Sequence, residues 1–161
     1  MKRTFLISGP VHSGKTTRLQ SWVNMNSYHK IDGILAPVLG GKRNLLHISS
    51  NEMKRLEFSE TEVRSTFTNI GKYSFDSHVF EWANKKLMET LNTKPEYVVI
   101  DEIGPLELQG QGLEPAVSEL LIKQREELDN IIVIVRSTLM QEFLLHYKLD
   151  PGDFSLMNLG L

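Results

Sequence analysis

The sequence predicts an α/β fold with a mostly parallel central sheet, helices on both faces, and an antiparallel hairpin or meander as an extension. Short, apolar, β-prone segments at 4–8, 97–100 and 131–135 have the composition of strands buried on both faces. Amphipathic segments separate them, and this alternation is typical of parallel strands joined by right-handed crossovers. The length of 161 residues, 40% of them hydrophobic, suits a single domain, which we place at 1–161.

Four helices are expected where apolar residues recur on one face. Their marker residues are Leu19, Trp22 and Val23 in the first, Phe80, Ala83, Leu87 and Leu91 in the second, Val117, Leu120, Leu121 and Leu128 in the third, and the segment 139–147 in the fourth. Asp76 or Ser77 is the expected cap of the second helix, and Tyr73 or Phe75 is expected to pack on its first turn rather than on a nucleobase. A last strand at 155–159 closes the chain.

The antiparallel extension is expected between the first and second helices. A strand over 31–39, a glycine-rich turn at 40–44 and a strand over 45–49 predict a hairpin. Two further segments, 55–58 and 63–67, alternate more weakly and would continue the hairpin as a meander.

Composition and charge exclude several classes of function. The net charge is −2, so no global basic field favours nucleic acid or an anionic membrane, and the pairs Lys42-Arg43 and Lys54-Arg55 are typical of a solvated hairpin. The chain has no cysteine, which excludes disulfides and thiolate metal sites. The histidines lack metal-ligand spacing, so we expect His29, His47, His78 and His146 in loops or on the surface. Because no segment fits a signal peptide or a membrane span, a cytoplasmic location is expected.

The strongest functional signal is a phosphate-binding loop between the first strand and the first helix. The run from Gly9 to Thr16 fits the Walker A pattern G-x-x-x-x-G-K-[ST]. The glycines allow backbone N–H groups to curl around phosphate oxygens, and the helix that follows adds partial positive charge. Lys15 is expected on the β- and γ-phosphates and the Thr16 hydroxyl on Mg²⁺, while His12 stands where many such loops carry glycine. The predicted nucleotide-binding residues are Gly9, Pro10, Val11, His12, Ser13, Gly14, Lys15, Thr16 and Thr17.

A pair of carboxylates follows the second buried strand, as the Walker B position requires. Asp101 and Glu102 come directly after 97–100, and ligands gather at the carboxyl ends of parallel strands. Asp101 is the predicted Mg²⁺ ligand with Thr16, and Glu102 is the predicted base for a water that attacks the γ-phosphate. Both side chains are expected to reach one site because the chain leaves the sheet here, before Gly104.

Two neighbouring features are open to more than one interpretation. The segment 105–115 has too much turn chemistry for a helix, and it is either a flap near the γ-phosphate or a plain surface loop. Arg136 follows the strand at 131–135 and is predicted to stabilise transition-state charge, the alternative being a solvated arginine without a role. The Asn-Lys-x-Asp guanine reader of GTPases is missing, so base selectivity for guanine is not expected.

Three segments of the chain carry a family resemblance. The loop Gly-Pro-Val-x-Ser-Gly-Lys-Thr-Thr, the segment 70–75 leading to Phe80-Glu81, and above all the run 99–108 resemble the nucleoside-triphosphatases first described in thermophiles, whose animal members are called cancer-related nucleoside-triphosphatases. The resemblance implies a phosphate-loop NTPase (RecA-like) three-layer sandwich with a catalytic glutamate, slow hydrolysis and weak base preference. It supports the roles given above to Lys15, Thr16, Asp101 and Glu102, and it matches Glu107 to a family glutamate of unassigned role.

The predicted function is a Mg²⁺-dependent nucleoside-triphosphatase that releases nucleoside diphosphate and phosphate, with ATP, GTP or another NTP as its substrate. Two alternatives use the same loop. A small phosphotransferase would pass the γ-phosphoryl group to a hydroxyl acceptor, although no arginine-dense lid is evident. A nucleotide-gated binding module would act through a conformational change that a protein partner recognises.

Overall fold

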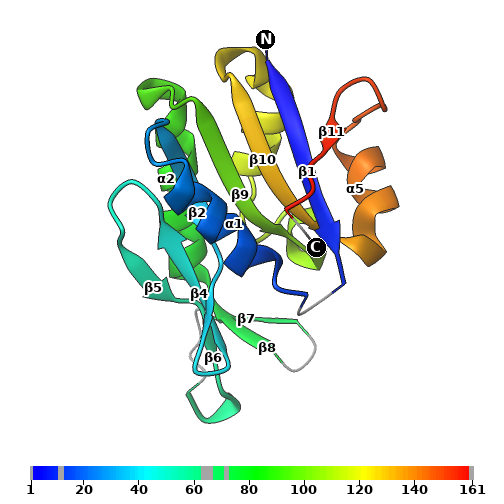
Figure 1. Cartoon of the computed structure of the whole chain (residues 1–161). Helices are drawn as coiled ribbons and strands as arrows, with labels where there is room; N and C mark the ends of the chain where they lie inside the picture. Colours follow the sequence, from blue (N-terminus) through cyan, green and yellow to red (C-terminus); the bar gives the residue numbers. More distant parts are fainter. Residues whose placement is uncertain (1, 11–12, 63–66, 71–72, 160–161) are drawn as a thin grey trace.

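The computed structural model describes residues 2–10, 13–62, 67–70 and 73–159, which form three layers around a mixed central sheet (Figure 1). The strand order in this sheet is β11-β1-β10-β9-β2-β4-β3, and β5 pairs with β4 outside this path. The strands are β1 (Arg3–Gly9), β2 (Ile31–Leu35), β3 (Val38–Leu39), β4 (Lys42–His47), β5 (Met53–Arg55), β9 (Tyr97–Ile103), β10 (Asn130–Arg136) and β11 (Ser155–Leu156). The predicted α/β class with a mostly parallel sheet is therefore confirmed.

The parallel part of the sheet contains the strands predicted from continuous apolar runs. β11, β1, β10, β9 and β2 are all parallel neighbours, and the register of β1 with β10 runs from Arg3 beside Asn130 to Gly9 beside Arg136. The carboxyl ends of β1, β9 and β10 therefore lie at one edge of the sheet, at the bottom of Figure 1. The last strand is shorter than the expected 155–159, since β11 ends at Leu156.

Helices cover both faces of the sheet and bury opposite sides of the same strands. On one face, α1 (Lys15–Met25) places Leu19 and Val23 in a core with Ile132 and Ile134 of β10. On the other face, Ile131, Val133 and Val135 of β10 pack in the main core. The elements on that side include α2 (Ser77–Thr93), α4 (Ala116–Ser118), the π-helical turn η2 (Glu119–Lys123) and α5 (Met140–His146), the last preceded by the 3₁₀ turn η4 (Ser137–Leu139). Burial on both faces explains why β10 is apolar at every position from Ile131 to Val135.

The antiparallel extension has the predicted hairpin but different strand boundaries. The expected strand over 31–39 is interrupted between β2 and β3, where Pro37 has no N–H to donate to a ladder. The turn is only Gly40 and Gly41, both with positive φ (58° and 74°), and β4 begins immediately afterwards at Lys42. β4 pairs antiparallel with both β3 and β2. The hairpin thus lies directly beside the end of β2.

The expected continuation at 55–58 and 63–67 is divided between two sheets. β5 ends at Arg55 and stays in the central sheet, whereas β6 (Glu57–Phe58) belongs to a second sheet of order β6-β8-β7. A 3₁₀ turn, η1 (Glu60–Glu62), follows β6, and residues 63–66 lie outside the described residues. β7 (Phe67–Ile70) pairs antiparallel with β8 (Tyr73–Asp76).

The entry of α2 agrees with its predicted cap. The Asp76 side chain accepts a hydrogen bond from the backbone N–H of His78. Phe75, one residue before the cap, meets Phe80 edge to face with ring centroids 6.0 Å apart, which is the arrangement of a hydrophobic staple. The expectation that Phe75 packs on the helix is confirmed.

The single helix predicted for 117–128 is wrong. α4 runs into the π-helical turn, whose five-residue repeat is closed by the bond from Gln124 N–H to the Glu119 carbonyl, and a 3₁₀ turn, η3 (Arg125–Glu127), follows. The four apolar markers are nevertheless buried as expected: Val117, Leu120, Leu121 and Leu128. Within the described ranges, none of the helices has the length and apolar run needed to cross a bilayer.

Candidate active site

The predicted phosphate loop joins the end of β1 to the start of α1. Gly14 has φ +81°, a left-handed conformation that favours glycine, and it stands directly before α1. A Cβ on Gly9 would lie 3.0 Å from Ser13 Oγ and 3.4 Å from Lys15 Cδ, so these side chains would have to shift by a few tenths of an ångström to admit it. Of the predicted binding residues, Val11 and His12 lie outside the described residues. The structure describes the other predicted positions, and their role in nucleotide binding stays a prediction.

Lys15 directs its ammonium group back into the loop. Its Nζ donates hydrogen bonds to the carbonyl oxygens of Gly9 (3.0 Å) and Pro10 (2.7 Å), and lies 3.4 Å from Ser13 Oγ. The residue is only 5% exposed. A positive charge is thus held between the end of β1 and the N-terminus of α1, where the partial charge of the helix also favours an anion.

Asp101 occupies the same site from β9. Its Oδ2 accepts a hydrogen bond of 2.8 Å from the Thr16 hydroxyl and one of 3.0 Å from the backbone N–H of Ala36. Its other oxygen, Oδ1, is buried and has no hydrogen-bond partner among the described residues. Burial, and then the nearby charge of Glu102, raise the pKa of Asp101 to about 6.

These groups fit a divalent cation such as Mg²⁺. The described residues contain no cluster of three or more acidic or histidine side chains that would enclose a metal. Mg²⁺ does not need one, because it keeps several waters and binds one or two protein oxygens together with substrate phosphates. The unpartnered Oδ1 of Asp101 and the adjacent Thr16 hydroxyl are oxygen donors of the required kind.

A β-bulge brings Asp101 and Glu102 to one site. The register of β9 with β10 pairs Ile100 with Val133 and Ile103 with Val135, so that two residues of β9 stand opposite one residue of β10. The expectation that the chain leaves the sheet at Asp101 is wrong, since β9 continues to Ile103. A bulge re-aims side chains within a strand and is frequent beside active sites, which explains the convergence physically.

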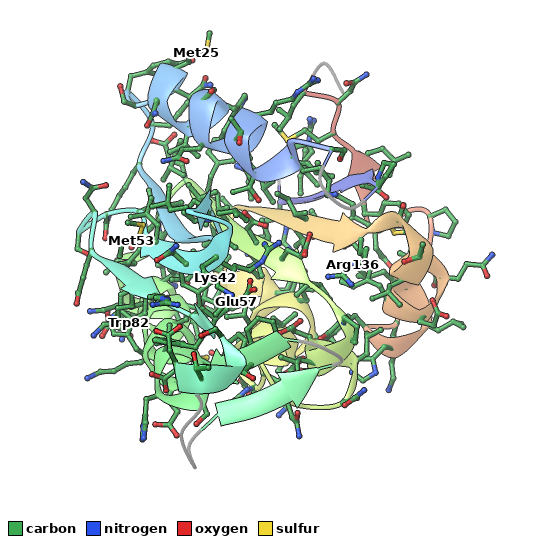
Figure 2. All side chains as sticks on the ribbon, turned by 90° about the horizontal axis from the view of Figure 1, so that it is seen from below. Met25, Lys42, Met53, Glu57, Trp82 and Arg136 are labelled. Atoms are coloured by element: carbon green, nitrogen blue, oxygen red, sulfur yellow. The ribbon has the colours of Figure 1, made fainter. Side chains whose placement is uncertain are left out.

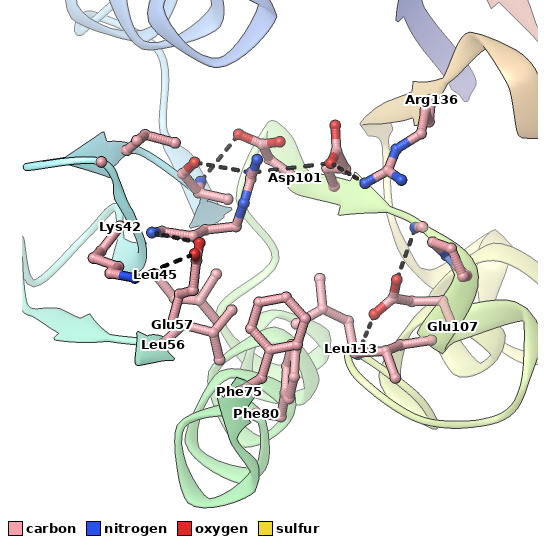
Figure 3. A pocket seen from close by; sticks show the side chains of 18 residues that line it. Lys42, Leu45, Leu56, Glu57, Phe75, Phe80, Asp101, Glu107, Leu113 and Arg136 are labelled. Atoms are coloured by element: carbon pink, nitrogen blue, oxygen red, sulfur yellow. Dashed lines mark hydrogen bonds and ion pairs between the residues drawn. The ribbon is translucent and has the colours of Figure 1, made fainter. Parts of the chain in front are cut away.

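The Glu102 carboxylate lies close to two arginines, of which Arg136 is labelled in Figure 3. Arg136 approaches with Nη2 at 3.4 Å from Glu102 Oε1, and Arg43 with Nη1 at 3.9 Å from the same oxygen. The Nε of Arg136 is buried without a partner within the described part of the chain. Arg136 therefore lies beside Glu102 with 31% of its side chain exposed, and its role in stabilising charge stays a prediction.

Sequence reasoning missed Arg43, which was expected on a solvated hairpin. Its position beside Glu102 results from β4 pairing with β2, whose neighbour is β9. Arg43 also contacts the carbonyl of Ala36 at 3.3 Å. Nothing in the local sequence distinguishes it from an exposed hairpin arginine.

The expectation that His47 lies in a loop or on the surface is also wrong. His47 is buried in β4, 3.1 Å from Asp32 and hydrogen-bonded to Ser50.

Glu107 makes its hydrogen bonds within its own segment of the chain and not with the described residues of the phosphate loop. It lies in the short helix α3 (Pro105–Leu108), where the sequence predicted no helix, and its two oxygens accept N–H bonds from Gly104 (2.8 Å) and Leu113 (2.9 Å). Gly112 is required beside it, since a Cβ there would lie 1.8 Å from Glu107 Oε2. Burial raises the pKa of Glu107 to about 7. The segment 105–115 is thus tied together internally by one carboxyl group.

The comparisons with known proteins concern the family and the fold of the whole chain. A protein-family model described as NTPase matches residues 4–154. No curated protein matches the sequence significantly. The crystal structure of THEP1 from the hyperthermophile Aquifex aeolicus is similar with a TM-score of 0.75 and 18% identity, over 97% of this chain and 89% of that chain. The solution structure of a human cancer-related nucleoside triphosphatase is similar with a TM-score of 0.62 and 23% identity, over 98% of this chain and 88% of that chain.

Proposed function

Because this chain belongs to the NTPase family, we propose that it is a Mg²⁺-dependent nucleoside-triphosphatase that cleaves the bond between the β- and γ-phosphates. The substrates would be ATP, GTP and other NTPs, and the products nucleoside diphosphate and phosphate. One observation carries the proposal: the Thr16 hydroxyl and the Asp101 carboxylate are joined beside the loop that holds Lys15, and one oxygen of that carboxylate is unpartnered. This is the donor set that a metal–triphosphate complex needs.

The proposed roles follow from where each side chain lies. Lys15 and the α1 N-terminus would bind the β- and γ-phosphates, with the loop residues from Gly9 to Thr17 around them. Thr16 and Asp101 would hold Mg²⁺, which would supply positive charge against the charge of the phosphates. Glu102 would accept a proton from water as the water oxygen bonds to the γ-phosphorus and the bond to the β–γ bridging oxygen breaks.

Arg136 is proposed to stabilise the charge that develops during this transfer. Its position at the end of β10, in register with Gly9 of β1, places it between the loop and Glu102. The buried Nε–H of Arg136 has no partner among the described residues, so this donor would be available for a phosphate oxygen. Weak base selectivity is part of the proposal, since the chain lacks the guanine reader of GTPases. A cytoplasmic location is also part of it, because a chain without cysteine suits a reducing compartment.

The test is phosphate release from ATP, GTP, CTP and UTP with no acceptor added. Each nucleotide should yield phosphate and the diphosphate when Mg²⁺ is present, at rates that agree within about tenfold, and release should stop when the metal is chelated. Asp101→Asn should show the same loss in the presence of Mg²⁺. Release of pyrophosphate would contradict the proposed bond cleavage. Tight nucleotide binding without turnover would favour a nucleotide-gated binding module instead.

A further inference from the structure

A cavity of about 620 Å³ lies beside Asp101 and Glu102, and both carboxylates line it. The sheet order places β10 and β1 on one side of β9, and β2 and β4 on the other. Most of the cavity is built from the second side, with walls from β4, β6, β8 and the segment that contains α3, and Arg136 of β10 lines it from the first side. None of the described residues of the phosphate loop lines it. The cavity therefore adjoins the predicted triphosphate site and shares Asp101, Glu102 and Arg136 with it.

The inner wall of this cavity is apolar and partly aromatic (Figure 3). It is formed by Leu45, Leu56, Phe75, Phe80 and Leu113. The three leucines are at most 2% exposed, so the wall belongs to the buried core. The volume of the cavity lies within the range of roughly 300 to 1,000 Å³ that is typical of small-molecule pockets. The wall suits the apolar or aromatic body of a small molecule.

The opposite wall is charged and contains the predicted base. Figure 2, a view onto the strand ends, shows Lys42 and Glu57 side by side and Arg136, the last residue of β10, apart from them. Lys42 Nζ is 3.9 Å from Glu57 Oε2, and Arg43 and Arg136 approach Glu102 from two sides. Glu102 lines the cavity, with 15% of its side chain exposed. A hydroxyl group at this wall would have a carboxylate as its proton acceptor and cations on both sides.

The geometry of phosphoryl transfer relates the cavity to the nucleotide. The attacking oxygen must approach the γ-phosphorus from the side opposite the bridging oxygen that leaves. With the β-phosphate in the loop and Glu102 at the γ-phosphate, the α-phosphate, sugar and base extend away from Glu102. The cavity beyond Glu102 is thus on the side of the attacking oxygen.

We propose that this cavity is a second substrate site, which takes a hydroxyl-bearing small molecule with an apolar or aromatic body as an acceptor of the γ-phosphoryl group. The acceptor oxygen forms a bond to the γ-phosphorus, the bond to the β–γ bridging oxygen breaks, and the hydroxyl proton passes to Glu102. The products are a phosphate monoester and a nucleoside diphosphate. The inference rests on the proposed function, because it uses the same γ-phosphate and the same base, with water as the acceptor when the cavity is empty.

The experiment uses three hydroxyl compounds as probes: benzyl alcohol, which is neutral, mandelate, which is anionic, and thymidine, which is larger. Each is incubated with the full chain, Mg²⁺ and ATP labelled in its γ-phosphate, and labelled monoester and labelled phosphate are separated and counted. Binding is followed by saturation-transfer NMR in the presence of a non-hydrolysable ATP analogue. At least one probe should bind and yield monoester at a rate at least tenfold above a reaction without protein.

Two variants locate the site. Leu56→Trp places a large side chain on the buried wall and should reduce probe binding and monoester formation at least tenfold, while phosphate release to water continues. Val38→Trp, at the 49% exposed rim, gives a second reading if Leu56→Trp fails to fold. Leu145→Trp is the matched control, since Leu145 is 80% exposed on α5 and does not line the cavity. It should change none of the readings.

The outcomes separate this inference from the proposed function. Phosphate release to water with neither binding nor phosphorylation of any probe would overturn the second site and leave the hydrolase proposal standing. Binding without phosphorylation would overturn its role as an acceptor site, and transfer that both cavity variants leave unchanged would overturn its location. Absence of both hydrolysis and transfer would instead remove the proposed function.

Discussion

The hydroxyl of Thr16 donates a 2.8 Å hydrogen bond to the carboxylate of Asp101, 85 positions further along the chain. The two residues come from the start of α1 and from the bulge in β9, elements separated by the whole antiparallel extension. Their contact joins the phosphate loop to the carboxylate pair. Because Asp101 also accepts the N–H of Ala36, the carboxylate is held in place with one oxygen left for a cation.

The role of Lys15 predicts a loss of nucleotide affinity in Lys15→Ala. Hydrogen bonds to charged groups contribute about 1.5 to 3 kcal/mol, so the Kd for a non-hydrolysable triphosphate should rise roughly 10- to 150-fold. Isothermal titration calorimetry measures this, with Lys85→Ala on the exposed side of α2 as the control. Equal affinity in Lys15→Ala and wild type would remove Lys15 from the phosphate site.

Glu102→Gln should lose turnover and keep nucleotide affinity. General-base catalysis contributes about 10²- to 10⁴-fold, so kcat for phosphate release should fall by that factor, with a Kd within about threefold of wild type. Glu127→Gln is the matched control, because Glu127 pairs with Lys94 on the surface at 2.7 Å. Retained turnover in Glu102→Gln would mean that another group activates the water.

The two arginines beside Glu102 should contribute unequally. Arg136 is in register with Gly9 and 3.4 Å from Glu102, whereas Arg43 is 3.9 Å away and two strands beyond β9. Arg136→Ala should lower kcat roughly 100-fold, and Arg43→Ala should lower it about tenfold. Steady-state kinetics with ATP compares the two, and Arg136→Lys shows whether charge alone restores turnover. A larger loss in Arg43→Ala would reverse the assignment of the transition-state arginine.

Glu107 predicts a pH dependence of stability. Its pKa is raised from 4.5 to about 7 in the folded protein, so the folded state binds the proton more readily than the unfolded chain. Stability from this group is present below pH 4.5 and is lost as pH rises through about 7.

The measurement for this group is urea denaturation at several pH values across that window. Across that pH window, the unfolding free energy of Glu107→Gln should fall by on the order of 1 to 3 kcal/mol less than that of the wild type. Glu126→Gln, at a side chain that is 87% exposed, is the control. Identical pH slopes in wild type and Glu107→Gln would show that Glu107 does not titrate in this range.

Local sequence predicted the elements whose signal is complete within a short window. The apolar runs of β1, β9 and β10 and the periodicity of α2 follow from burial of continuous segments. The phosphate loop and the Asp101-Glu102 pair were found for the same reason, since their chemistry depends on adjacent residue types. The predicted element boundaries were wrong where contacts beyond a short window decide them. Examples are the interruption around Pro37 and the π-helical turn after α4.

The sequence by itself determined that this chain carries a glycine-rich loop of the Walker A pattern and two carboxylates in a buried strand, because both features are encoded by neighbouring residues. Only the tertiary structure decided that a bulge turns both carboxylates to one site, that Arg43 reaches Glu102, and that Glu107 ties a loop together. The cavity beyond Glu102 belongs to the second group as well. Each depends on strands and loops distant in the chain, and no local pattern records which of them become neighbours.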